Sequence, residues 1–360
     1  MAYTNIDDPS AYFQTAIYTG AGSTVVAVTN DGNSDLQPDF LWFKRRDSAG
    51  GHALLDTSRG ANVTSGFGPT GYSFVLNSNS TASEVADSTG VMTITSDGFT
   101  AKELTFAGGN TNTGSMVAWQ WHCNGGTTSS NTDGDITSTV QVNSDAGFSI
   151  VTDSPSNNTA RSIGHGLGVA PQVIIRRARN RVENWRVFHS AAGSTGALTL
   201  DNADAYNSST VLFTGVTSTT FGVGTDFSVN GNYNYISYCF AEKQGYSKFG
   251  SYVGNGSADG PFVYTGFKPA WIMVKDTESS GDNWQILDTK RDPHNPQLKY
   301  LQADNASAEG SFTFVDILSN GFKFRSTYFV GPNVAGHKTI YMAFAENPFV
   351  TSTGIPTTAR

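Results

Sequence analysis

The chain has 360 residues, 38% of them hydrophobic and 12% aromatic, which is enough for two or three packed domains and excludes wholesale disorder. A net charge of −8 with only 14% charged residues argues against wrapping nucleic acid, because phosphate contacts need concentrated Lys and Arg. Only seven of the 30 acidic residues are Glu, and 39 Gly accompany abundant Thr, Val, Phe and Tyr, so the composition predicts an all-β protein.

The first residues, MAYTNIDDPSAYF (1–13), contain neither a basic segment nor an apolar run, which argues against a signal peptide. The sequence also lacks a stretch of about 18 apolar residues that would span a membrane. We therefore expect a protein that is made in a cytoplasm, remains soluble and does not insert into a membrane.

Three prolines, Pro38, Pro171 and Pro269, each introduce an apolar run, and a polar gap separates this run from a second one. Apolar runs of this kind predict central strands covered on both faces, and the gaps predict hairpin loops. A polar arc and an aromatic strand follow in every copy. The runs are FLWF (40–43), VII (173–175) and WIMV (271–274), and the polar arcs are LNSNSTASE (76–84), LDNADAYNS (200–208) and LQADNASAE (301–309).

This triple repeat predicts three tandem, related β-sandwich modules of jelly-roll-like form, each of about a hundred residues. We expect each module to enclose its own hydrophobic core, with the three strung along the chain. The predicted ranges are 1–123 for module 1, 124–147 for a polar linker with a strand around Val140 and Val142, 148–246 for module 2, 247–346 for module 3, and 347–360 for a tail that is flexible or orders against a neighbour.

Two pairs of carboxylates recur at equivalent places of the repeat. Glu242 and Glu346 close equivalent strands, and Glu84 and Glu309 end equivalent polar arcs. Equivalent positions of tandem modules normally lie far apart, whereas a glycosidase needs two carboxylates facing one another across a cleft. These residues therefore favour a structural role. The Asp–Arg pairs within LDTSR (55–59) and LDTKR (287–291) are expected to be local turn partners.

Several other residue types receive a structural interpretation. Cys123 and Cys239 occupy different positions of the repeat in apolar strands, so we expect buried free thiols rather than a disulfide or a metal site. GHGLGVAP (164–171) is interpreted as a turn into a strand with Leu167 in the core, because a phosphate-binding loop would precede a helix. The one basic cluster, Arg176, Arg177, Arg179 and Arg181, is expected to form a solvated hairpin face or to contact an acidic neighbouring subunit.

Candidate metal and binding residues are few. Asp133 and Asp135 in NTDGDIT (131–137) offer oxygens for Ca²⁺, but the other ligands of an EF-hand loop are missing and Asp-Gly is a common turn, so calcium binding there stays open. DNADAYN (201–207) offers a weaker version. The histidines lack metal-ligand spacing. The histidines concerned are His52, His122, His189, His294 and His337.

Aromatic residues are the remaining candidates for recognition. All six Trp lie in or beside the repeated strands, so we expect them in cores, and Tyr206, Tyr233 and Tyr235 on polar segments are weak candidates for ligand contact. We predict no enzyme, and no catalytic, cofactor-binding or metal-binding residues. The Trp residues are Trp42, Trp119, Trp121, Trp185, Trp271 and Trp284.

The opening segments DDPSAYFQTAIYTGAGS (7–23) and NDGNSDLQPDFLWFK (30–44) resemble the start of a family of bacteriophage virion proteins that abounds in marine phages. SIGHGLGVAPQVII (162–175), the long segment 238–275 and IYMAFAENPF (340–349) extend this resemblance over nearly the whole chain. The shared residues are scaffold elements, so they are specific for the family and unspecific for function. The first copy departs at its end, with WQWHC where the other copies have CFAE and AFAE.

The resemblance implies a structural protein located in the virion after synthesis in the host cytoplasm. We expect display on the particle exterior as a tail-fibre-like or appendage component for host attachment. A capsid decoration or cement protein that stabilises the head is the alternative, and a polysaccharide-degrading spike is a minor one. Expected partners are other tail or capsid proteins and a host-surface glycan or protein. Because virion parts are built by symmetry, we also expect a homo-oligomer, with a trimer for a fibre or spike.

Overall fold

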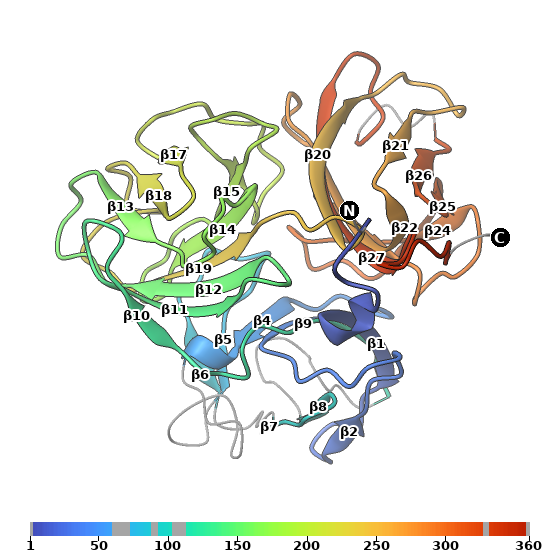
Figure 1. Cartoon of the computed structure of the whole chain (residues 1–360), viewed down its shortest axis with the longest axis horizontal. Coiled ribbons are helices and arrows are strands. Elements are labelled where there is room, and N and C mark those ends of the chain that lie inside the picture. Colours follow the sequence, from blue (N-terminus) through green and yellow to red (C-terminus); the bar gives the residue numbers. More distant parts are fainter. Residues whose placement is uncertain (1–2, 60–72, 88–92, 103–112, 327–330, 358–360) are drawn as a thin grey trace.

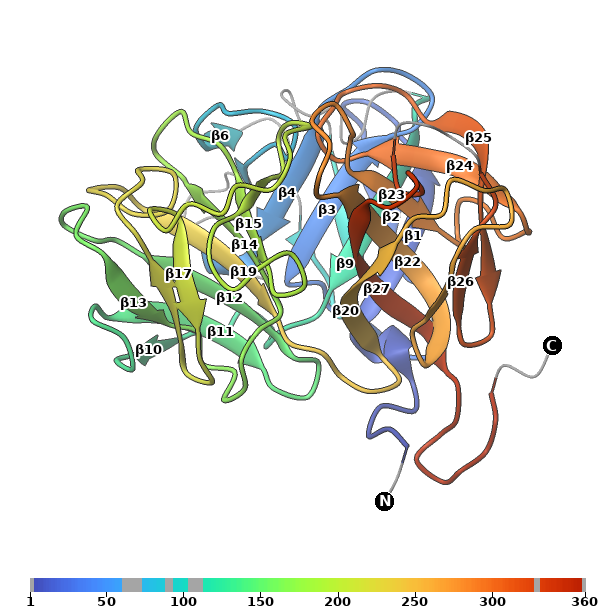
Figure 2. The same ribbon diagram turned by 90° about the horizontal axis from the view of Figure 1, so that it is seen from above.

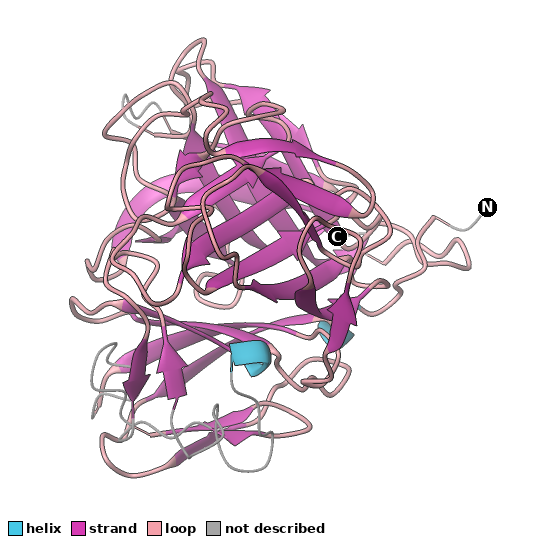
Figure 3. Cartoon of the chain, turned by 90° about the vertical axis from the view of Figure 1, so that its left-hand side faces the viewer, coloured by secondary structure: helices cyan, strands magenta, loops and turns pink. Residues whose placement is uncertain are grey.

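The computed structural model describes residues 3–59, 73–87, 93–102, 113–326 and 331–357, and these residues form β-strands with two single-turn 3-10 helices (Figure 1; Figure 3). The all-β prediction is confirmed. Within the described ranges, no helix is long and apolar enough to cross a membrane.

The first unit is built on a four-stranded antiparallel sheet of order β1-β9-β3-β4, flanked by two small sheets of order β2-β8-β7 and β5-β6. The bounds are η1 (Pro9–Ala11), β1 (Phe13–Thr19), β2 (Val26–Val28), β3 (Phe40–Arg45), β4 (His52–Asp56), η2 (Thr57–Arg59), β5 (Ser73–Val75), β6 (Val85–Asp87), β7 (Thr93–Ile94), β8 (Phe99–Ala101) and β9 (Ser115–Trp121).

The second unit has a seven-stranded sheet of order β10-β11-β12-β19-β14-β15-β16 and a three-stranded sheet of order β13-β18-β17. Segment 124–147 contains the expected strand at Val140 and Val142, but the prediction that it is a linker is wrong. Its strands β10 and β11 pair onward to β12 and so belong to this sheet. The bounds are β10 (Ser129–Asn131), β11 (Ser138–Asn143), β12 (Phe148–Asp153), β13 (Arg161–Gly164), β14 (Val173–Ala178), β15 (Arg186–His189), β16 (Leu198–Thr199), β17 (Phe213–Val216), β18 (Thr220–Val223) and β19 (Tyr235–Phe240).

The third unit is one eight-stranded sheet of order β20-β27-β22-β23-β24-β25-β26-β21, which curls into a nearly closed, barrel-like form (Figure 1). A jelly-roll-like sandwich is therefore not established as the common form of the three units. The bounds are β20 (Ser247–Val253), β21 (Phe262–Tyr264), β22 (Phe267–Asp276), β23 (Gln285–Asp288), β24 (Gln297–Gln302), β25 (Gly310–Leu318), β26 (Gly321–Phe324) and β27 (Lys338–Pro348).

A four-strand order nevertheless repeats in all three units, as β1-β9-β3-β4, β12-β19-β14-β15 and β20-β27-β22-β23. The apolar runs form the third strand of each, hydrogen-bonded on both sides, and the polar gaps are hairpin loops, as predicted. The hairpin register defines equivalent positions. It places Phe40, Val173 and Trp271 opposite Asp56, His189 and Asp288, respectively.

The three units surround one shared hydrophobic core. Trp121, Phe240 and Phe344, one residue from each unit, meet at its centre with ring centroids 5.6 to 6.4 Å apart. A smaller core lies on the outer side of each central sheet. The expectation of three separate cores strung along the chain is therefore wrong, because the inner face of every central sheet is covered by the other two units, which gives a closed ring (Figure 1; Figure 2).

The described part of the tail packs on its own chain. Strand β27 runs on to Pro348, and Asp7 accepts hydrogen bonds from Ser352 N at 2.6 Å and from Ser352 Oγ at 2.5 Å. Both terminal segments leave the same side of the molecule (Figure 2). The tail therefore contacts the N-terminal segment of its own chain at Ser352.

Candidate functional site

Buried cations hold each unit of the ring to the polar arc of another unit. The central strands β3, β14 and β22 carry Lys44, Arg177 and Lys275 at equivalent positions, all fully buried. Burial lowers the pKa of Lys44 to about 8, with Arg45 and Arg291 adding to the effect. The donors and accepting carbonyl oxygens are Lys44 Nζ to Ala306 at 3.3 Å, Arg177 Nη1 to Ser80 at 2.5 Å and Lys275 Nζ to Ala203 at 3.2 Å.

Hydrogen bonds from side-chain ring nitrogens link the units in the same order, from the first unit to the third, the second to the first and the third to the second. His52 Nδ1 accepts a hydrogen bond from Trp42 Nε1, which leaves Nε2–H to donate to a carbonyl of the third unit. Burial lowers the pKa of His52 to about 3, so this imidazole is neutral. The inter-unit bonds are His52 Nε2 to Gln302 O, Trp185 Nε1 to Asn77 O and Trp284 Nε1 to Thr199 O, each 2.8 Å.

The two glutamates of the polar arcs each bridge two arginines. The Glu309 carboxylate accepts hydrogen bonds from Nε and Nη2 of Arg46 in the first unit and from Nη1 of Arg291 in its own unit. Burial raises the pKa of Glu309, but the two guanidinium groups outweigh it and hold the pKa below its usual value. Glu84 is held in the same way by Arg179 and Arg59. The structural role predicted for Glu84 and Glu309 is consistent with this geometry.

The polar arc between the second and third units, LDNADAYNS (200–208), contains no glutamate to bridge two arginines. It contains Tyr206 instead. There Tyr206 N donates to Thr277 O at 2.9 Å. The local Asp–Arg pairs are confirmed, and their carboxylates also reach another unit. Asp56 accepts hydrogen bonds from Arg59 Nε and from Tyr238 Oη of the second unit. Asp288 accepts hydrogen bonds from Arg291 Nε and from Trp119 Nε1 of the first unit.

The expectation for the basic cluster is wrong for its first half. Arg176 and Arg177 are fully buried, and Arg176 forms a bidentate pair with Asp153 at 2.7 and 2.8 Å inside the second unit. Arg179 binds Glu84 of the first unit, so the acidic partner belongs to the same chain. Alternating strand residues face opposite sides of a sheet, and here both sides are covered.

Other predicted residues are placed as follows. All six Trp are buried in the shared core, and both Cys are buried free thiols, as predicted. Leu167 is buried beside His165, whose Nδ1 accepts Leu167 N. Tyr235 is fully buried, so its prediction as a recognition residue is wrong. The closing glutamates pair locally, Glu242 with Lys248 and Glu346 with Lys268.

The calcium candidates are engaged in turns. Asp135 Oδ2 accepts Ser162 N at 2.6 Å and Ser162 Oγ at 2.9 Å, while Asp133 Oδ2 accepts Asn131 Nδ2 at 3.0 Å. In the described part of the chain, no group of three or more His, Cys, Asp and Glu could hold a metal ion.

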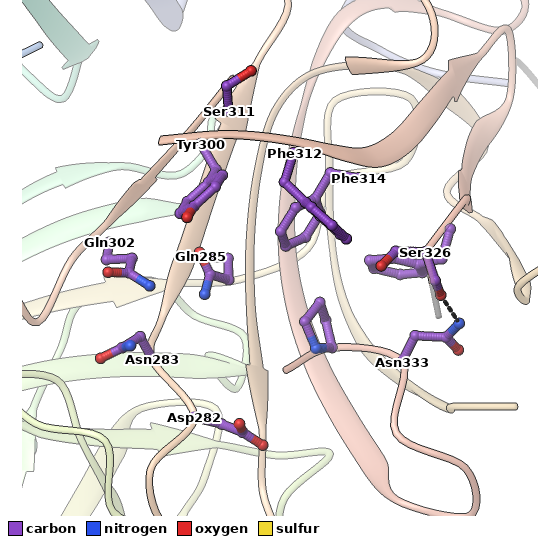
Figure 4. A pocket seen from close by; sticks show the side chains of 12 residues that line it. Asp282, Asn283, Gln285, Tyr300, Gln302, Ser311, Phe312, Phe314, Ser326 and Asn333 are labelled. Atoms are coloured by element: carbon purple, nitrogen blue, oxygen red, sulfur yellow. Dashed lines mark hydrogen bonds between the residues drawn. The ribbon is translucent and has the colours of Figure 1, made fainter. Parts of the chain in front are cut away.

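A hollow of about 200 Å³ opens between strands β23 to β26 of the third unit. Aromatic side chains of β24, β25 and β26 line part of it. Tyr300 and Phe312 flank Phe314, with ring centroids 5.7 and 6.4 Å from it, and Phe324 completes this group. Amide side chains and the Asp282 carboxylate occupy the remaining lining, and Figure 4 shows Gln285 and Gln302 across the hollow from Phe312.

Asp282 is the notable polar residue of this hollow, because it is only 2% exposed and neither carboxylate oxygen makes a hydrogen bond of standard geometry within the described residues. Burial raises its pKa, and the Asp276 carboxylate adds to that rise. The charge of Lys275 and a backbone hydrogen bond from Gly331 oppose this rise. Gln285 Oε1 is likewise buried without a partner among the described residues.

The described lining consists mainly of aromatic and amide side chains. It contains one carboxylate and no His, Cys, Lys or Arg, whereas hydrolysis of a glycosidic bond needs two carboxyl groups. Sequence reasoning missed this hollow. The sequence gives little indication of the hollow. Asp282 lies in the third polar gap, and the equivalent positions of the first and second gaps are Gly50 and Glu183.

Comparison with curated proteins and with solved structures gave no match. A protein-family model described as a domain of unknown function, DUF7483, matches residues 8–348. This range spans all three units of the ring, so the family corresponds to the whole assembly and not to one repeat. The chain therefore belongs to the family described as domain of unknown function DUF7483.

Proposed function

We propose that the protein is a non-enzymatic structural component of a bacteriophage particle, displayed on its exterior as an attachment module. The resemblance to virion proteins supports this proposed location. The observation that carries the structural role is the shared core, in which three units lock around Trp121, Phe240 and Phe344 into one block. A block of this kind presents its loops in fixed positions, which suits a part that contacts a host surface.

The closed ring also favours a second candidate, a decoration or cement protein of the capsid. Three units strung in line would give reach, whereas a ring gives a broad, compact body that can cover a junction between neighbouring capsid subunits (Figure 2). The two candidates differ in copy number, because a decoration protein follows the capsid lattice and an appendage does not.

The experiment is immunogold electron microscopy of purified particles, combined with a quantitative gel for copy number. Label at the tail with up to a few dozen copies supports the appendage, and label over the head with hundreds of copies supports decoration. Absence of the protein from purified particles contradicts both. The non-enzymatic part is tested separately, since shortening of host surface polysaccharide by the purified protein would overturn it.

A further inference from the structure

We propose that the hollow of the third unit, lined by Asp282, Gln285, Tyr300, Gln302, Phe312 and Phe314, binds one ring of a neutral sugar. This inference goes beyond the structural role above and does not depend on where the protein sits in a particle. Four features of the hollow lead to it, and each restricts the class of ligand.

The first feature is the pairing of aromatic rings with polar groups. Phe312 is 37% exposed and packs edge-on against Phe314, so part of an aromatic ring is exposed to solvent beside the hollow. Gln285 and Gln302 lie across the hollow (Figure 4). A sugar ring has the matching character, with C–H groups on its faces that pack on aromatic rings and hydroxyl groups at its edge that bond to amides.

The second feature is a set of buried acceptors with few donors. Gln285 Oε1 lacks a hydrogen-bond partner among the described residues, and within those residues the Asp282 carboxylate has a backbone donor in Gly331 but no bond of standard geometry. Buried acceptors in that condition are costly, so a ligand that supplies hydroxyl donors gains by satisfying them. An ionised carboxylate accepts on both oxygens, which matches two adjacent hydroxyl groups of a sugar.

The third feature is charge. The described lining contains no Lys or Arg, so it offers nothing to balance a phosphate, sulfate or uronic acid. A cationic ligand is disfavoured as well, because buried Lys275 donates to Asp282 O at 2.5 Å and already places a positive charge beside the carboxylate. A volume of about 200 Å³ is smaller than the roughly 300–1,000 Å³ of pockets for drug-sized ligands and suits one ring.

The fourth feature is that the position of Gln285 carries a different type of side chain in each of the other two units. Gln285 corresponds to Arg186 in the second unit, where the guanidinium donates to Ser228 Oγ at 2.9 Å and to Thr199 Oγ1 at 2.8 Å. In the first unit the equivalent residue is Ala53, which has no polar side chain. Among the described residues at these equivalent positions, the buried amide of Gln285 is thus particular to the third unit.

The test uses the full chain and a panel of methyl glycosides of glucose, galactose, mannose and N-acetylglucosamine, screened by saturation-transfer NMR and then titrated. Methyl glucuronide and glucosamine serve as anionic and cationic probes. We expect at least one neutral glycoside to bind with a Kd on the order of millimolar, more tightly than either charged probe. Phe312→Ala and Asp282→Asn should each weaken this binding at least tenfold.

Phe262→Ala is the matched control, because Phe262 is also an exposed Phe of the third unit, at 47%, and does not line the hollow. It should leave the affinity unchanged, and thermal melts should show that all three variants fold. Absence of saturation transfer to every neutral glycoside overturns the proposal. Tighter binding of a charged probe overturns it too, as does binding that survives in both Phe312→Ala and Asp282→Asn. A negative result leaves the proposed virion role standing, since particle localisation tests that role.

Discussion

Arg46 of the first unit forms a bidentate ion pair with Glu309 of the third, 263 positions along the chain, with N–O distances of 2.9 and 3.1 Å. The backbone strengthens this link, because Glu309 N donates to Arg46 O at 2.7 Å. Arg179 and Glu84 make the same contact between the second and first units. A contact that joins neighbouring units elsewhere thus also joins the last unit to the first, which closes the ring.

Replacement of Arg46 by Ala should weaken this closure. Glu309 would keep Arg291 but lose two charge-assisted hydrogen bonds in a partly buried place, so we expect the free energy of unfolding in urea to fall by about 2 kcal/mol. Arg45→Ala is the control, because Arg45 pairs with Asp47 on the surface and exposed pairs contribute less than about 1 kcal/mol. Equal losses in the two variants would contradict a role for Arg46 in ring closure.

Truncation of Phe344 to Ala should destabilise the whole chain and not the third unit alone. Its ring contacts both Trp121 of the first unit and Phe240 of the second, and deletion of a buried Phe side chain costs about 3–5 kcal/mol. Near-ultraviolet circular dichroism and far-ultraviolet circular dichroism should show one shared, lowered transition. The exposed Phe262→Ala variant should change stability by less than about 0.5 kcal/mol. A separate early transition in Phe344→Ala would show that the third unit melts independently.

Asp304 predicts a pH dependence of stability with a defined sign. Burial raises its pKa from 3.8 to about 7, so the folded state binds its proton more tightly than the unfolded state does. The stabilising contribution is complete below pH 4 and is lost as the pH rises to 7. Asp304→Asn removes this dependence, so at pH 8 the variant should be the more stable protein by up to about 4 kcal/mol.

The Asn substitution is compatible with the fold, because the first unit uses Asn79 in the corresponding place. Asn79 Oδ1 accepts His52 N at 2.9 Å, as Asp304 Oδ1 accepts Trp284 N at 3.2 Å. His52 and other buried groups titrate in both proteins, so the measurement is the difference in unfolding free energy between variant and wild type from pH 4 to pH 8. A difference that does not grow with pH would contradict the raised pKa.

The two thiols should be unreactive in the folded protein. Burial raises the pKa of Cys123, with Asp39 adding to the rise, and burial raises the pKa of Cys239 to about 12. Since the thiolate is the nucleophile, we expect an aromatic disulfide reagent at pH 8 to label neither Cys in native protein and both in urea. Rapid labelling of one thiol without denaturant would show that its unit opens on its own.

The sequence predicts the strands well and their partners poorly. Pro-led apolar runs identify β3, β14 and β22, and the positions of the Trp residues identify core strands, because alternation and apolar content report burial directly. Periodicity does not say what covers a buried face. Trp121 faces Phe240 and Phe344 across the shared core, and nothing local in WQW (119–121) distinguishes that from packing within its own unit.

Polarity misleads where polar groups are satisfied inside the protein. Arg177 is interpreted as solvated because an isolated buried guanidinium is costly, but carbonyl oxygens of the first polar arc, at Ser80 and Ala82, accept its hydrogen bonds. Ser, Thr and Gly in segment 124–147 indicate a linker, yet β10 and β11 form an outer part of a sheet, where polar strands are common. Asp282 escapes prediction because Tyr300 and Phe312, which line the same hollow, come from later strands.

The central claim, that three units share one core, is tested most directly by native-state hydrogen exchange with mass spectrometry in increasing urea. We predict that amides of β3, β14 and β22 open together, with one free energy equal to that of global unfolding, because each central sheet is covered by the other two units. The contradicting result is three different opening free energies, with one central strand exchanging while the other two stay protected.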